Sequence, residues 1–330
     1  MAMAADGSVG PGSGEGLFAV DEGIVGIDLL FQQRPHLIAA YVLLGPQGRF
    51  ALVETGPQST ADRLEAALQA LGLAPEALEA ILVTHIHLDH AGACGLLARR
   101  SRCPIYVHEV GLPHLAEPSR LWASTARTFG DNAERFWGGV TPVPAERLRP
   151  VSEGTRLSVC GRRVDVLYTP GHASHHVALL VDGDVLFSGD AAGVWVADGS
   201  YVRPPTVPPE LDVEAWEATI ARIRRLKPRV LVPTHFGAQR DGLPEKLQAL
   251  ARRLRQWVQA VLEGMRQGLD EAALAARLDQ LERDELASLG LGGEDLATVL
   301  ELSTPRTVAV RAIQRYWTKH HPEQLTAAQP

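Results

Sequence analysis

Three histidines and one aspartate crowd into a single seven-residue segment of this chain. Thr84–His90 reads T-H-I-H-L-D-H and directly follows the apolar run Ala80–Val83. Packing in a core gives no reason to gather imidazoles and a carboxylate at this spacing. Both groups are ligands that borderline divalent ions such as zinc prefer. The segment therefore predicts a metal-binding loop at the end of a buried strand.

Three more side chains of the same two kinds follow, each at or just after a short β-like run. His172 ends the tetrad T-P-G-H, Asp190 ends S-G-D, and His235 ends P-T-H. Together with the first cluster they indicate a hydrolytic site for two metal ions. The predicted metal ligands are His85, His87, Asp89, His90, His172, Asp190 and His235.

The spacing suggests how the ligands divide between two ions. His85 and His87 are two residues apart, so in an extended segment both imidazoles point the same way and can reach one ion. His172 would complete that first set.

Asp89 and His90 begin the turn into a helix and would hold the second ion together with His235. One carboxylate can offer an oxygen to each ion, so Asp190 is the predicted bridge. Asp89 and Asp190 are the side chains we expect to be catalytic. Metal ions lower the pKa of bound water from about 16 to about 7, so a hydroxide held between the ions would be the nucleophile.

The elements that must position these loops follow from hydrophobic patterning. Strands are predicted over Gly23–Ile27, Leu37–Leu44, Phe50–Val53, Ala80–Val83, Arg163–Tyr168, Val177–Val181, Asp184–Phe187 and Val230–Val232. Helices are predicted over residues 59–71, 90–100 and 212–226. Strands followed by helices, twice over, predict an α/β (α+β) fold in which helical layers enclose two sheets.

Composition divides the chain into three parts. Residues 1–16 are rich in Gly and Ser, lack the apolar stretch of a signal peptide, and are predicted to be a disordered tail. Residues 17–243 form the predicted catalytic domain. From 244 to 330 apolar residues recur at helical spacing, which predicts a helical region.

Charge and cysteine content narrow the class of protein. The net charge of −7 argues against general binding to nucleic acid. The sequence has no run of about 18 apolar residues, so no membrane span is predicted. The three cysteines form no C-x-x-C pair, which is typical of reduced thiols in a cytoplasmic protein. We expect a small-molecule substrate and consider a homodimer compatible with the helical region.

These motifs resemble the metallo-β-lactamase-fold superfamily, and within it the glyoxalase II-like hydrolases, over about residues 20–240. The resemblance implies an αββα sandwich. It also implies one metal held by the two histidines of H-x-H and by His172, a second held by the D-H pair and His235, and Asp190 as the bridge. The true zinc β-lactamases lack such a bridging aspartate, so antibiotic hydrolysis is not the expected main activity.

The chain departs from this family pattern at two places. Glu54 stands in E-T-G where the family has D-T-G, and the extra methylene should alter hydrogen bonding around the metal ligands. His175 replaces the glycine of T-P-G-H-T-x-G-H. This imidazole is either a proton shuttle at the pocket edge or, as we favour, a solvated or indirectly acting side chain.

Substrate contacts are harder to predict. The segment between Asp190 and Asp212 is rich in aromatic residues and proline, so it is either a pocket wall or a proline-stiffened surface loop. The candidate substrate contacts are His175, Trp195, Tyr201 and Arg203.

The predicted function is a hydrolase that uses two divalent ions, zinc first and iron or manganese as alternatives, on a thioester, ester or lactone. One alternative is a persulfide dioxygenase, which resembles the same pattern and would hold one iron at His85, His172 and Asp190. A second is a two-metal phosphodiesterase or nuclease, which the acidic net charge disfavours. A binding protein without catalysis would have no need of the full ligand set.

Overall fold

The computed structural model describes residues 16–326 and resolves into two compact units. The first contains residues up to 168 together with 175–189 and 228–240. The second contains 169–174, 190–227 and the chain from 241 onward. The predicted tail over 1–16 lies almost wholly outside the described residues. The domain limits 17–243 and 244–330 stay a prediction.

A seven-stranded sheet forms one layer of the first unit. Its first four strands are antiparallel neighbours, and the fourth to seventh run parallel. In sheet order the strands are β1 (Leu17–Asp21), β2 (Ile24–Asp28), β3 (Ala39–Leu44), β4 (Phe50–Val53), β5 (Leu78–Leu82), β6 (Ile105–His108) and β7 (Leu148–Val151).

A five-stranded sheet forms the second layer of the same unit. Its order is β14 (Val230–Val232), β11 (Val185–Phe187), β10 (Val177–Val181), β9 (Arg162–Tyr168) and β8 (Arg156–Val159). Apolar side chains of both sheets join one buried cluster, in which the rings of Tyr41 and Phe187 lie 5.3 Å apart. The two sheets therefore pack face to face, as the sequence predicts, and each large side chain buried there contributes about 1.5–3 kcal/mol.

Helices connect the parallel strands, because parallel neighbours need a crossover. The helices of this unit are α1 (Ala61–Ala70), α2 (Leu88–Ala91), α3 (Cys94–Arg100), α4 (Leu112–Ala116), α5 (Ser119–Phe129) and α6 (Ala133–Trp137). The predicted helix over 90–100 is wrong in one respect, since it is divided into α2 and α3. Gly92 lies at the break, where a Cβ would approach Cα of Pro57 to 3.0 Å.

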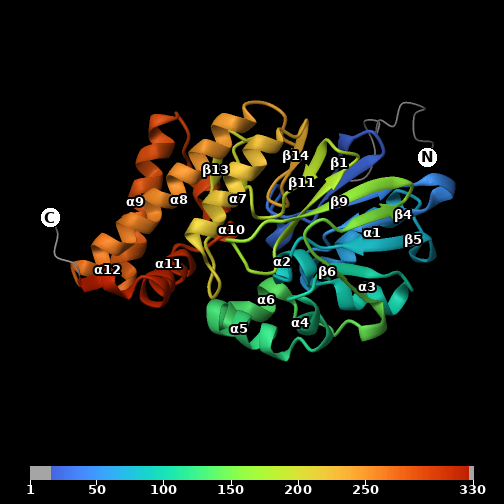
Figure 1. Ribbon diagram of the computed structural model, residues 1–330, viewed down its shortest axis with the longest axis horizontal. Helices are drawn as coiled ribbons and strands as arrows, with labels where there is room; N and C mark the ends of the chain where they lie inside the picture. Colours follow the sequence, from blue (N-terminus) through green and yellow to red (C-terminus); the bar gives the residue numbers. More distant parts are fainter. Residues whose placement is uncertain (1–15, 327–330) are drawn as a thin grey trace. The chain divides into compact units, whose positions relative to one another are not determined.

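The second unit is mainly helical, which confirms the predicted C-terminal helices. A hairpin of β12 (Val194–Val196) and β13 (Tyr201–Arg203) belongs to it. Its helices are α7 (Val213–Leu226), α8 (Leu243–Arg266), α9 (Glu271–Ser288), α10 (Glu294–Ser303), α11 (Arg306–His320) and α12 (Pro322–Thr326). Helices α8, α9 and α11 contact one another (Figure 1). Among residues 16–326, no helix combines the length and apolarity needed to cross a membrane.

Candidate metal centre

The candidate ligands of the first unit follow the carboxyl ends of parallel strands. β4 and β5 are parallel neighbours, so Glu54 and the segment Thr84–His90 leave the seven-stranded sheet at the same edge. β11 and β14 are parallel neighbours in the other sheet, where Thr234–His235 follows β14. A hydrogen bond of 2.8 Å from the Val177 amide to the Thr84 carbonyl joins the two edges.

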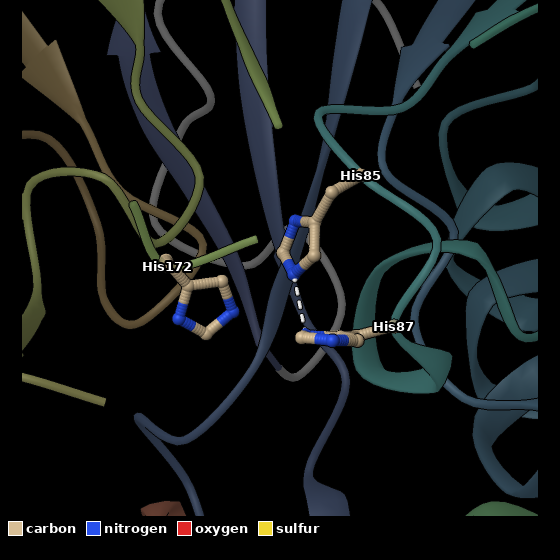
Figure 2. Close-up of side chains that lie close together, drawn as sticks. All are labelled: His85, His87 and His172. Carbon is tan, nitrogen blue, oxygen red and sulfur yellow. Dashed lines mark hydrogen bonds between the residues drawn. The ribbon is translucent and has the colours of Figure 1, made fainter. Parts of the chain in front are cut away.

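Five of the seven predicted ligands are neighbours within the first unit. Nε2 of His85 lies 2.9 Å from Nδ1 of His87 (Figure 2). The rings of His85 and His90 are 3.9 Å apart. Oδ2 of Asp89 lies 3.5 Å from Nε2 of His90 and 3.3 Å from Nε2 of His235. The sequence predicted this convergence from residue types and spacing.

The other two predicted ligands form a pair in the second unit, with Nε2 of His172 at 3.2 Å from Oδ2 of Asp190. Both are tied covalently to first-unit residues. His172 lies in the short segment Thr169–Ser174, which joins Tyr168 to His175, and Asp190 directly follows Gly189.

Two groups of candidate ligand atoms result, and within each group all atoms lie within 4.8 Å of one another. The first is His85, His87 and His172, and the second is Asp89, His90, Asp190 and His235. Asp190 is in the second group and lies beside His172 of the first, and the division of these residues between two ions stays a prediction.

Hydrogen bonds orient two of the imidazoles for metal binding. Nδ1 of His172 donates to the carbonyl of Pro205 at 2.8 Å, and Nδ1 of His235 donates to the carbonyl of Leu37 at 2.6 Å. Because a carbonyl can only accept, the proton of each neutral imidazole is on Nδ1. Each Nε2 is therefore an electron-pair donor, which is the form that binds a metal ion.

For His90, a carboxylate in place of a backbone carbonyl accepts the hydrogen bond from Nδ1. Its Nδ1 lies 3.1 Å from Oε1 of Glu54, and both side chains are almost completely buried. Glu54, at the position where the family pattern has Asp, thus lies beside a candidate ligand, and an effect of its extra methylene stays a prediction.

The charge on Asp89 suits a metal ligand. Burial by itself raises the pKa of this carboxyl, but the adjacent His90 and His235 imidazoles, when protonated, hold that pKa well below its usual range. Asp89 is thus ionised at neutral pH. Buried carboxylates and imidazoles with oriented Nε2 atoms are a donor set that fits divalent ions such as zinc.

His175 lies beside the first group. Its ring stacks on His85 at 6.0 Å between centroids and meets the ring of His87 edge-on at 5.6 Å. Only 4% of the residue is exposed, so it is not the solvated imidazole that we considered from the sequence. A contact between His175 and substrate stays a prediction.

The other three candidate substrate contacts are buried in the β12–β13 hairpin. Nε1 of Trp195 donates to the carbonyl of Ala192 at 2.9 Å. The guanidinium of Arg203 pairs with Glu282 at 3.3 Å, and burial lowers its pKa to about 10. Tyr201 is also fully buried. These contacts stabilise the second unit, and contact of the three residues with substrate stays a prediction.

Residues 34–235 match the sequence profile of the metallo-beta-lactamase superfamily. A metallo-beta-lactamase fold-containing protein of Sulfurisphaera tokodaii is 31% identical over 163 residues, covering 48% of this chain and 61% of that protein. A hydroxyacylglutathione hydrolase of Xanthomonas euvesicatoria is 31% identical over 150 residues, covering 46% of this chain and 44% of that enzyme. The chain thus matches about half the length of these relatives.

A solved structure, that of a metallo-beta-lactamase family protein from Thermus thermophilus, resembles this fold with a TM-score of 0.62. The two chains are 24% identical, and the match covers 86% of this chain and 88% of the other. At that identity the likeness establishes the fold and leaves the reaction to the chemistry of the site.

Proposed function

Because this chain belongs to the metallo-beta-lactamase superfamily, we propose that it is a metal-dependent hydrolase of a thioester, ester or lactone. One observation carries the proposal. Asp190 belongs to the second ligand group and also lies 3.2 Å from Nε2 of His172, a member of the first. A carboxylate so placed can serve two ions, which supports the proposal of a two-metal hydrolytic site.

Two divalent ions held there would supply hydroxide from water near neutral pH and polarise the carbonyl under attack. The chain's own contribution is to hold the donors in a fixed geometry. The backbone carbonyls of Pro205 and Leu37 keep His172 and His235 in the metal-binding tautomer, and Asp89 stays ionised. We propose zinc as the resident metal, with iron or manganese as the alternatives, because imidazole suits zinc and iron and carboxylate suits manganese.

The similarity to a hydroxyacylglutathione hydrolase favours a thioester as the substrate. The cleaved bond would then join an acyl group to a thiol of small or moderate size. A cytoplasmic location remains part of the proposal.

The first measurement is the metal content of protein purified without added metal or chelator, by elemental mass spectrometry. We expect about two ions per chain, followed by turnover in a panel of thioesters and lactones. One iron per chain together with oxygen uptake on glutathione persulfide would contradict the hydrolase and support the dioxygenase.

The variant Asp190→Asn tests the proposed bridge. We expect turnover to fall by at least about 100-fold, since loss of one strong electrostatic contact to the reacting centre typically costs that much. The matched control is Asp62→Asn on the exposed face of α1, which should leave turnover unchanged. Turnover at the wild-type level in a folded Asp190→Asn protein would refute the assignment.

A further inference from the structure

One candidate metal ligand, His172, is held by a later stretch of the second unit. Nδ1 of His172 donates to the Pro205 carbonyl at 2.8 Å. Beside it, the Asp212 amide donates to the Gly171 carbonyl at 2.8 Å. All four residues belong to the second unit. The stretch 205–212 thus determines both the tautomer of the His172 ring and the course of the backbone that carries it.

A buried arginine ties the start of this stretch to the C-terminal helices. Arg203 is the last residue of β13, two positions before Pro205, and it is completely buried. Its guanidinium lies 3.3 Å from Oε1 of Glu282 in α9, and at the end of α10 it donates to the Ser303 hydroxyl at 3.0 Å and the Thr304 carbonyl at 3.3 Å. Carbonyls at a helix end lack partners within the helix, and basic side chains often satisfy them. Arg203 therefore joins β13 to two helices at once.

The link from Arg203 to the Pro205 carbonyl is short and stiff. Pro204 is the single residue between them, and the ring of each proline fixes its φ near about −65°. Pro204, Pro205 and Thr206 are all buried. The Thr206 amide donates to the Pro204 carbonyl at 3.0 Å, which closes a tight turn. The chain can absorb little movement here, so a displaced Arg203 moves the carbonyl that orients His172.

A second arginine holds the neighbouring backbone of β13. Arg253 of α8 donates to the Val202 carbonyl at 2.6 Å and pairs with Glu285 of α9 at 2.8 Å. Well-packed apolar side chains often stabilise a core as much as a buried ion pair does. What the charged groups add is direction, because a guanidinium places its donors in a rigid fork against particular acceptors. The contacts of Arg203 and Arg253 therefore fix where β13 ends.

We propose that Arg203 is a positioning residue for His172, through which the C-terminal helices α9 and α10 set the affinity for the ion that His172 binds. The proposal rests on the metal centre proposed above. It gives the C-terminal helices a role that requires no contact with substrate. The hydrogen bonds described above carry this role from the helices to Arg203, along the two prolines, and on to Nδ1 of the imidazole.

The test compares two variants of the full-length protein that perturb the same ion cluster. Glu282 pairs with Arg203 and also with Arg306 at the start of α11. Arg203→Met and Arg306→Met each leave Glu282 one arginine, so both should lose stability in urea denaturation. Only Arg203 leads directly into the stretch that holds His172. Arg306→Met is therefore the matched control for a loss of stability without a loss of position.

Competition between the protein and a zinc chelator yields the stepwise dissociation constants. Arg203→Met should weaken one step by about 10-fold, the lower end of the effect of mutating a group that supports a metal ligand. Arg306→Met should leave both steps unchanged. Arg203→Lys keeps the positive charge beside Glu282 but lacks the fork that also reaches the end of α10, so it should weaken the same step. This variant keeps the test decisive if Arg203→Met does not fold.

A second measurement needs no metal. Nitrogen-15 spectra of the metal-free protein follow the Nδ1 protons of His172 and His235, which both donate to backbone carbonyls. In Arg203→Met the His172 proton should exchange with water faster than in the wild type. The His235 proton, whose acceptor belongs to the first unit, should keep its wild-type rate. A general loss of stability would instead speed the exchange of both protons.

Two results would overturn the inference. One is a folded Arg203→Met protein with wild-type zinc affinity and a wild-type exchange rate at His172. The other is an equal loss of zinc affinity in Arg203→Met and Arg306→Met, which would show that the cluster acts through stability alone. Neither readout uses turnover, so either result would leave the proposed hydrolysis standing. A protein that bound no zinc would refute the metal centre, and the exchange measurement would still test the link from Arg203 to His172.

Discussion

Replacing Gly189 by alanine should destabilise the protein next to the candidate metal centre. Gly189 has φ of +48°, and a Cβ built there would lie 2.4 Å from Oγ1 of Thr84 and 2.7 Å from Nε2 of His176. Real Cβ contacts are essentially never shorter than 3.0 Å, so a neighbour must move. Since the Thr84 hydroxyl lies between Glu54 and His85, that movement also disturbs a candidate metal ligand.

The expected cost has two parts. The left-handed conformation costs alanine about 1–2 kcal/mol, and overpacking a close-packed site costs about 1–3 kcal/mol. The free energy of unfolding of Gly189→Ala should therefore fall by about 2–5 kcal/mol. Urea denaturation followed by circular dichroism measures this quantity, and chelator competition should show weaker zinc binding.

The matched control is Gly72→Ala. Gly72 has φ of +73°, and a Cβ there would meet no atom within 4 Å. This variant should lose only the conformational part, about 1–2 kcal/mol, with zinc affinity unchanged. Equal losses of stability in the two variants would refute the packing argument, because they would show that the contacts with Thr84 and His176 add nothing.

Three further outcomes are expected. Removing metal with a chelator should lower the melting temperature reversibly, because an ion present at 100 times its Kd stabilises the folded state by about 2.7 kcal/mol. An unchanged melting temperature would argue against bound metal. Glu282→Gln should lower the free energy of unfolding, measured by urea denaturation, by about 3–5 kcal/mol, because it leaves the buried Arg203 guanidinium uncompensated. Arg283→Ala, at an exposed ion pair, should lower it much less, and similar losses in the two variants would contradict this account. Asp212→Ala should lower the free energy of unfolding by about 1 kcal/mol, because the Asp212 carboxylate caps α7 by accepting a hydrogen bond of 2.9 Å from the Ala215 amide. Wild-type stability in this variant would show that the cap contributes nothing.

Local pattern was sufficient for several strands that are continuous apolar runs and for the helices of the second half. The apolar runs at 50–53, 177–181 and 230–232 are strands, and most of the predicted helix over 59–71 is α1, whose buried face includes Leu64, Ala67 and Leu68. The sequence pattern did not predict the strands β6, β12 and β13. β6 has four residues and pairs with β5 and β7, which are distant in the chain, whereas β12 and β13 have three residues each and pair with one another.

The sequence by itself determined which side chains could bind metal, because imidazoles and carboxylates gathered at the ends of apolar runs suit metal binding and contribute little to core packing. Tertiary structure alone decided their protonation and orientation. Glu54 reaches Thr84 across 30 residues, His90 across 36 and Thr234 across 180. The pairing of the buried Arg203 guanidinium with Glu282 likewise joins residues that are distant in the chain. Hydrogen bonds between residues so far apart follow from the way the strands are brought together, and local patterning carries no signal of them.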